Sequence, residues 1–224
     1  MAHYKTFAFK SLSALSTEST SELCTSDKAF QLISGTVTYD ASPPSYISRF
    51  IEYSIRIDDK GCTSIANITS ISAEETLRLR VERFGDDEWR QKLLSIQKNN
   101  DVEDEDGVWE DKVEWENLPG LKGCLDIDFS FTPITNALPI RRLRILDSDP
   151  NKSHNISAAW LRMPQFKLER AEQEYTYLGK SGDEHLVRYK SKASGYTADV
   201  SVDDDGIVIK YADEWERTKV EMDE

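Results

Sequence analysis

Hydrophobic and polar residues alternate along most of this chain with a period of two. In one such run Tyr53, Ile55 and Ile57 alternate with polar residues. Successive side chains of a β-strand point to opposite faces, so this alternation is typical of an antiparallel strand with one buried face. We expect about ten to twelve strands of this kind. The clearest runs are residues 53–57, 77–82, 125–131 and 198–202.

Two further segments carry clear local signals. The sequence DDDG at residues 203–206 separates two extended runs, and Asp and Gly tolerate the positive φ angles of a tight turn, which predicts a hairpin. Residues 86–98 begin with acidic residues and end with Lys98, the arrangement that a helix dipole favours. We therefore predict a helix there, followed by an acidic loop, as an insertion at residues 84–106.

A single domain is predicted for residues 1–220. The chain shows no internal repeat and no linker rich in Pro, Gly or Ser, and its 224 residues can enclose one core. The expected fold class is mainly β, with a single curved antiparallel sheet or an incomplete β-barrel and one or two short helices. Residues 221–224 are expected to be a disordered tail.

Charge and composition exclude several classes of function. The net charge of −13 disfavours nucleic acid as a partner and adhesion to anionic lipid. The three Cys are far apart and the chain has only three His, so we predict no metal site and no cofactor. We expect the thiols to be reduced, as is usual in a cytoplasmic protein. The first residues lack the apolar run of a secretory signal, and no stretch is long enough for an integral membrane span.

The segment from Leu121 to Leu146 holds most of the candidate chemistry. It predicts a strand, a break at Thr132-Pro133, and a second strand that restarts at Pro139. Asp126 and Asp128 would share one face of the first strand. They are candidates for a general acid and base, for hydrogen bonds to a polar headgroup, or for ion pairs with arginines.

The other candidates each have a structural alternative. Arg141 and Arg142 could clamp a phosphate or carboxylate, or form ion pairs at the corner between the strands. Thr135 and Asn136 could bind a ligand or hold a turn. Cys124 is more plausible as a buried thiol than as a nucleophile. Seven aromatic residues could line a cavity or belong to the core, namely Trp109, Trp115, Trp160, Tyr175, Tyr189, Tyr211 and Trp215.

The same segment resembles the central signature of the putative glycolipid-binding family. The family pattern has a Gly-Cys-x-Asp-x-Asp strand followed by Thr-Pro-x-Thr-Asn-x-Leu-Pro-Ile-Arg-Arg-Leu, which residues 123–128 and 132–143 match in order and spacing. The likeness extends over residues 107–215. It implies a curved sheet or incomplete barrel similar to the half-barrels that carry lipoproteins and lipids, and it brings no established catalytic residue.

Three hypotheses for function follow. The first is a binding module that holds an amphipathic small molecule or glycolipid in the groove of the sheet, without catalysis. Its ligand-binding residues would be Asp126, Asp128, Thr135, Asn136, Arg141, Arg142, Trp160, Tyr175 and Tyr189. The second is a hydrolase-like or isomerase-like enzyme that uses Asp126, Asp128 and Arg141. The third is a scaffold whose acidic segment at residues 101–116 binds a basic protein partner.

Overall fold

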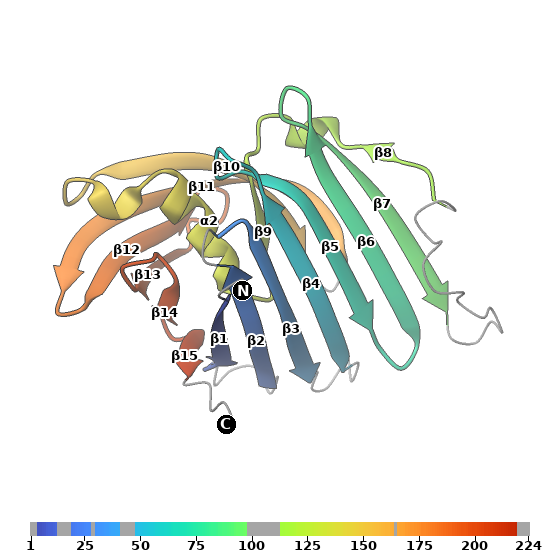
Figure 1. Ribbon diagram of the computed structural model, residues 1–224, viewed down its shortest axis with the longest axis horizontal. Helices are drawn as coiled ribbons and strands as arrows, with labels where there is room; N and C mark the ends of the chain where they lie inside the picture. The colour runs from blue at the N-terminus through green and yellow to red at the C-terminus, as the bar shows by residue number, and fades with distance from the viewer. Residues whose placement is uncertain are drawn as a thin grey trace.

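The protein folds around one large antiparallel sheet, shown in Figure 1. The computed structural model describes residues 4–12, 19–27, 30–40, 48–97, 113–163 and 165–218. In these ranges the strands are β1 (Tyr4–Ser11), β2 (Ser19–Asp27), β3 (Leu32–Asp40), β4 (Arg49–Ile57), β5 (Thr63–Ile71), β6 (Glu75–Phe84), β7 (Glu88–Gln97), β8 (Glu116–Asn117), β9 (Asp126–Phe129), β10 (Ser153–Arg162), β11 (Lys167–Ser181), β12 (Glu184–Ser191), β13 (Thr197–Val202), β14 (Val208–Tyr211) and β15 (Trp215–Thr218). The helical elements are η1 (Pro119–Leu121), η2 (Ile134–Asn136), α2 (Ala137–Arg142) and η3 (Ile145–Asp147).

The order of the strands follows the chain in two blocks. Strands β8 to β1 are neighbours in reverse sequence order, and β1 then pairs with β15, which continues through β14 down to β9. Neighbouring strands are antiparallel, except that β9 and β10 are parallel. The pairing of β1 with β15 joins the first and last parts of the chain into a single sheet. This confirms the mainly β fold class.

The sheet curls until its β9 edge meets β5, as Figure 1 shows. The amide of Thr63 donates to the carbonyl of Leu125 over 2.9 Å, and Thr63 Oγ1 accepts from the amide of Ile127 over 3.0 Å. The predicted alternation sets which face is inside. In β4, Ile51, Tyr53 and Ile55 are buried, whereas the polar residues between them are half-buried or exposed. The result is an incomplete barrel with a hydrophobic inner face.

A short helical segment occupies the inside of the curl. Every residue from 131 to 140 is buried, and this stretch contains η2 and most of α2. Pro139 is tolerated in α2 because it lies in the first turn, where the amide has no partner within the helix. We call residues 131–142 the plug, because this segment lies inside the curl of the sheet (Figure 1) and its residues 131–140 are buried.

Two predicted elements are wrong. Residues 86–98 do not form a helix, since Glu88–Gln97 is strand β7, which pairs with β6 from Glu75↔Gln97 to Phe84↔Glu88. The second strand predicted from Pro139 is also absent, because residues 137–142 form α2. In both places tertiary packing overrides a weak local signal. Residues 98–112, which hold the predicted acidic loop, lie outside the described residues.

Another local prediction agrees with the fold. The hairpin at Asp203–Gly206 is present, with the amide of Gly206 donating to the carbonyl of Asp203 over 2.9 Å. Cys62 and Cys124 are free thiols, and the side chain of Cys24 lies outside the described part. In the described ranges we find no helix with the length and hydrophobicity to cross a membrane. The same ranges contain no group of acidic, His or Cys side chains that could hold a metal ion.

Candidate functional site

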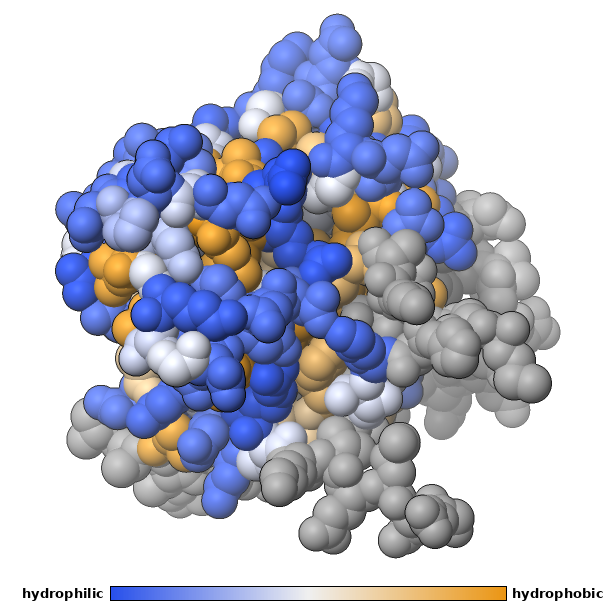
Figure 2. Space-filling view, turned by 60° about the vertical axis from the view of Figure 1, so that its left-hand side comes forward, coloured by the Kyte–Doolittle hydropathy of each residue, from blue (hydrophilic) through white to orange (hydrophobic). Residues whose placement is uncertain are grey.

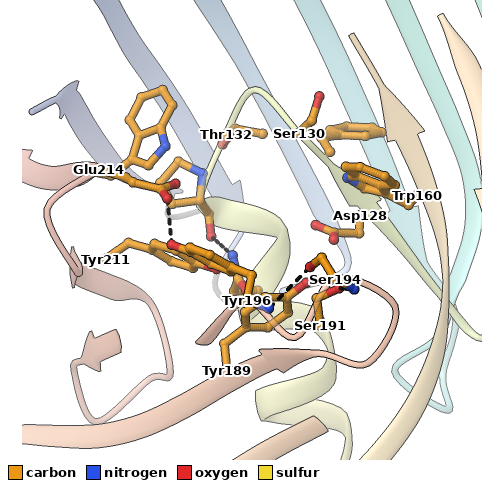
Figure 3. A pocket seen from close by; sticks show the side chains of 14 residues that line it. Asp128, Ser130, Thr132, Trp160, Tyr189, Ser191, Ser194, Tyr196, Tyr211 and Glu214 are labelled. Carbon is orange, nitrogen blue, oxygen red and sulfur yellow. Dashed lines mark hydrogen bonds between the residues drawn. The ribbon is translucent and has the colours of Figure 1, made fainter. Parts of the chain in front are cut away.

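A pocket of about 320 Å³ opens at one end of the curled sheet and is shown in Figure 3. Its walls come from the end of β9, the connection into the plug, β10, the loop between β12 and β13, and the turn between β14 and β15. The lining residues are Asp128, Phe129, Ser130, Thr132, Pro133, Asn136, Trp160, Tyr189, Ser191, Ser194, Tyr196, Tyr211, Glu214 and Trp215. The pocket thus combines aromatic rings, hydroxyl groups and two carboxyl groups.

Asp128 supplies a half-buried carboxyl group to this pocket. Thr135 Oγ1 donates to its Oδ1 over 2.9 Å, and Gln173 Nε2 donates to its Oδ2 over 2.7 Å. Burial raises the pKa of Asp128, and the hydrogen bonds from Gln173 and Thr135 only partly oppose this effect. Within the described ranges, no Lys, Arg or His forms an ion pair with Asp128. The group is therefore held by neutral donors alone.

Three tyrosine side chains lie close together in the lining of the pocket. The ring of Tyr189 lies 6.2 Å from those of Tyr196 and Tyr211, measured between ring centroids. Tyr196 donates its hydroxyl hydrogen to Glu214 Oε1 over 2.5 Å. Burial raises the pKa of Tyr189, Tyr196 and Tyr211, so these phenols stay protonated near neutral pH. They offer ring faces together with neutral hydroxyl groups.

A buried hydrogen-bond network holds the floor of the pocket in place. Asn136 Oδ1 accepts from the hydroxyl of Tyr175 over 3.0 Å, and its Nδ2 donates to the carbonyl of Pro133 over 3.1 Å. Tyr175 is 1% exposed, so its ring belongs to the core, although its hydroxyl supports a lining residue. Thr135 is also buried and bonds the lining residue Asp128. These two residues position the site without lining it.

Asp126 takes a different environment from Asp128. Its carboxylate is 1% exposed and accepts two hydrogen bonds from Arg142, from Nε over 3.1 Å and from Nη2 over 2.5 Å. Burial acts to lower the pKa of Arg142, but the hydrogen bonds and charge of Asp126 outweigh it and raise that pKa. This is the bidentate ion pair that the sequence suggested as one alternative. It ties the end of α2 to β9 and does not line the pocket.

Arg141 points to another part of the molecule. Its Nη1 donates to the carbonyl of Asp205, and its guanidinium lies 4.2 Å from the centre of the Phe30 ring. The catalytic grouping of Asp126, Asp128 and Arg141 is therefore not assembled, because only Asp128 lines the pocket. Of the nine candidate residues, Asp128, Asn136, Trp160 and Tyr189 line it. Of the aromatic candidates, Tyr211 and Trp215 line it as well.

The sequence reasoning did not name eight of the fourteen lining residues as candidates. Among these eight, Ser191 ends β12, Ser194 and Tyr196 lie in the loop after it, and Glu214 lies in the turn after β14, where no periodic pattern marks them. Their one common signal is the position of polar and aromatic residues at strand ends. Trp115 lies away from the pocket, 4.1 Å from the Arg90 guanidinium, and Trp109 lies outside the described residues.

Cys124 behaves as a buried thiol. It is 0% exposed, and burial raises its pKa to about 11, which leaves almost no thiolate at neutral pH. Its Sγ accepts a hydrogen bond from Arg170 Nη1 over 3.8 Å. The interpretation of Cys124 as a small core residue agrees with this geometry.

Comparisons with known proteins place these features in context. A sequence model of the family described as putative glycolipid-binding matches residues 97–217, which is more than half of the 224 residues. The match contains every residue that lines the pocket. No curated protein matches the sequence.

Two solved structures match this chain. A crystal structure of a DUF1089 family protein from Pseudomonas aeruginosa is 22% identical, with a TM-score of 0.59, and the alignment covers 81% of this chain and 83% of that chain. The crystal structure of a β-barrel-like protein of domain of unknown function DUF1849 from Brucella abortus is 9% identical, with a TM-score of 0.49 and coverage of 97% and 96%. The likeness to the DUF1089 family protein shows that the two chains share a fold.

Proposed function

Because the chain belongs to the putative glycolipid-binding family, we propose that it is a binding module for an amphipathic molecule, a glycolipid being the first candidate. The observation that carries this proposal is the pocket beside Asp128, in which ring faces and polar groups lie together. Sugars present apolar ring faces and hydroxyl groups, so aromatic rings and hydrogen-bond acceptors suit them. We place the polar headgroup of the ligand in this pocket.

The size of the pocket supports a headgroup more than a whole lipid. Its volume of about 320 Å³ is small, near the lower end of the roughly 300–1,000 Å³ that is typical of small-molecule sites. The plug lies inside the curl of the sheet, where its residues Ile134 and Leu138 are 0% and 2% exposed. The apolar part of the ligand would then extend from the mouth of the pocket.

The outer surface offers no obvious alternative on the face that Figure 2 shows. Hydrophilic residues dominate the coloured part of this face, and hydrophobic residues form small, separated groups. A protein that adheres to a lipid surface through a broad patch would expose contiguous apolar residues. The coloured part of this face therefore gives no support to adhesion on a lipid surface.

The direct test is to identify a bound molecule. The protein is purified without detergent, examined by native mass spectrometry, and then extracted with organic solvent. We expect the extract to contain an amphipathic molecule in near-stoichiometric amount, with a hydroxylated headgroup. A protein that carries no such molecule, and that also fails to bind alkyl glycosides in titrations, would contradict the proposal.

Replacing Trp160 by alanine is expected to weaken binding of an alkyl glycoside such as octyl glucoside by about tenfold or more. Trp160 is half-buried and lines the pocket, so the variant removes a ring face that a sugar could contact. A loss of about 1.4 kcal/mol corresponds to tenfold in affinity. Isothermal titration calorimetry, below the critical micelle concentration of the glycoside, measures this change in affinity.

The matched control for this change is Trp115→Ala. Trp115 stacks under Arg90 and Lys92, with its ring 4.1 Å and 5.0 Å from their charged groups, and it does not line the pocket. Its loss should leave the affinity within about twofold of the parent protein. Equal effects of the two substitutions would argue against this pocket as the binding site.

A further inference from the structure

The charges of the pocket are all of one sign. Asp128 and Glu214 are its charged lining residues, and no Lys, Arg or His is among the residues that line it. The basic side chains gather instead around a separate depression, which is lined by Lys60, Arg141, Arg142 and Arg144 among others. The two depressions share no lining residue. An anionic headgroup in the first pocket would meet two carboxyl groups and no cation among the lining residues, although the guanidinium of Arg162 lies 5.7 Å from the centre of the Trp160 ring.

The carboxyl group of Asp128 has unused capacity to accept hydrogen bonds. Its oxygens accept bonds from Thr135 and Gln173, and the carboxyl also has a backbone hydrogen bond from Phe129, whereas an ionised carboxylate offers about four acceptor sites. Figure 3 shows the group beside the pocket, between Trp160 and the loop that carries Ser194. Two hydroxyl groups on one ring could therefore donate to it while the ring lies against an aromatic face.

The rest of the lining favours hydroxylated ligands over simple hydrocarbon. Ser130, Thr132, Ser191 and Ser194 bring hydroxyl groups to the wall. Tyr196 already donates to Glu214, which leaves its hydroxyl oxygen free to accept a bond. A headgroup with several hydroxyl groups can exchange hydrogen bonds with these residues on more than one side.

We infer that the pocket selects its ligand by charge: it takes a neutral, hydroxylated sugar headgroup and rejects anionic headgroups, with Asp128 as the residue that determines this selectivity. The inference rests on the proposed function and adds the class of headgroup to it. Phosphate and sulfate groups would be repelled at short range by the half-buried Asp128 and the exposed Glu214, and salt screens such partly exposed charges.

The experiment compares two amphiphiles with the same tail. Octyl glucoside and octyl phosphate are titrated into the full-length protein below their micelle concentrations, at low ionic strength and neutral pH. We expect octyl glucoside to bind at least about tenfold more tightly, and we expect added salt to narrow this difference. Equal or tighter binding of octyl phosphate would overturn the inference even though the protein binds amphiphiles. Binding of neither would overturn the proposed function itself.

Asp128→Asn tests the residue assigned to this selectivity. The variant should bind octyl glucoside about tenfold more weakly and should reduce the preference over octyl phosphate. Asp149→Asn is the matched control, since Asp149 is exposed and does not line the pocket, and both affinities should stay unchanged. An Asp128→Asn variant that keeps both affinities would contradict the assignment. If that variant does not fold, the preference of the parent protein and its salt dependence still decide the inference.

The pH dependence provides an independent readout. Burial raises the pKa of Asp128, so the carboxylate that accepts from the sugar is lost as pH falls through this raised value, which lies above the ordinary range of Asp. The other titratable groups around Asp128 are Asp126, Glu214 and the phenols of Tyr175, Tyr189 and Tyr211. Burial raises the pKa of these three phenols, so they remain neutral over the pH range of the experiment. Affinity for octyl glucoside should therefore decline with acidification in the parent protein and less in Asp128→Asn.

Discussion

Replacing Arg142 by methionine is expected to lower the free energy of unfolding by about 3–5 kcal/mol at neutral pH. The substitution keeps much of the side-chain volume but removes both hydrogen bonds to Asp126, whose carboxylate is 1% exposed. A buried charge without a partner is strongly destabilising, whereas a paired one is tolerated. Urea unfolding followed by tryptophan fluorescence measures the change.

The pH dependence of this loss has a definite sign. Burial already raises the pKa of Asp126 in the presence of the ion pair, and the hydrogen bonds and charge of Arg142 partly oppose this effect. Without Arg142 the pKa of Asp126 in the folded protein therefore moves further upward. In the folded variant Asp126 then holds a proton that the unfolded chain has released. The loss in free energy of unfolding relative to the parent protein therefore grows as pH rises above the ordinary pKa of Asp. The deficit should shrink on acidification, because Asp126 becomes protonated in both states.

Two further variants separate a buried charge from a general loss of packing. Arg144→Met changes an arginine whose side chain is 81% exposed, and it should cost less than about 1 kcal/mol. Adding Asp126→Asn to Arg142→Met should recover most of the stability, because no unpaired charge remains. A loss below about 1 kcal/mol for Arg142→Met, or a double variant no more stable than the single one, would contradict this account.

The ion pair also illustrates what the sequence could predict. Pairing of Asp126 and Asp128 with Arg141 or Arg142, across a turn between two strands, was one of the alternatives, and the pair of Asp126 with Arg142 does form. The arginine, however, belongs to a helix, so the contact is right and the element is wrong. Charged residues in an otherwise buried stretch indicate a partner nearby, but they do not indicate the backbone conformation that brings the partners together.

The strands were predictable wherever one face of the sheet packs inside and the other faces water. β4 is an example, since Ile51, Tyr53 and Ile55 are buried and Glu52 and Arg56 are exposed. β7 was missed because only Trp89 among its residues is buried, which leaves the strand without a regular alternation. Its identity as a strand comes from pairing with β6, and pairing with a distant segment leaves little trace in local sequence.

The candidate site was predictable only in part for the same reason. Asp128 and Gln173 are separated by 45 residues in sequence, yet one donates to the other over 2.7 Å. The sequence identifies such residues as able to form hydrogen bonds with a ligand or with each other. It cannot say which aromatic residues face the same end of a curled sheet, because that depends on the sense and degree of the curl. Residues in loops, such as Tyr196 and Glu214, carry even less signal.

Replacing Leu138 by alanine in the plug is expected to lower the free energy of unfolding by about 2–5 kcal/mol. Leu138 is 2% exposed and lies in α2, inside the curl of the sheet. The substitution leaves a cavity that the surrounding strands cannot easily close, because they are held by continuous pairing from β8 to β9. Chemical denaturation gives the stability.

The expected size of this loss distinguishes a structural plug from a movable lid over an empty barrel. Leu93→Ala is the matched control, because Leu93 is 38% exposed and its truncation should cost less than about 1 kcal/mol. If the plug were a lid that a lipid displaces, Leu138→Ala would cost no more than this control and would tighten binding of long-chain amphiphiles. The structural plug predicts instead a large loss of stability and an unchanged preference for the chain length of the amphiphile. The core under the plug would then be closed to the ligand, and the binding energy would come from the pocket beside Asp128.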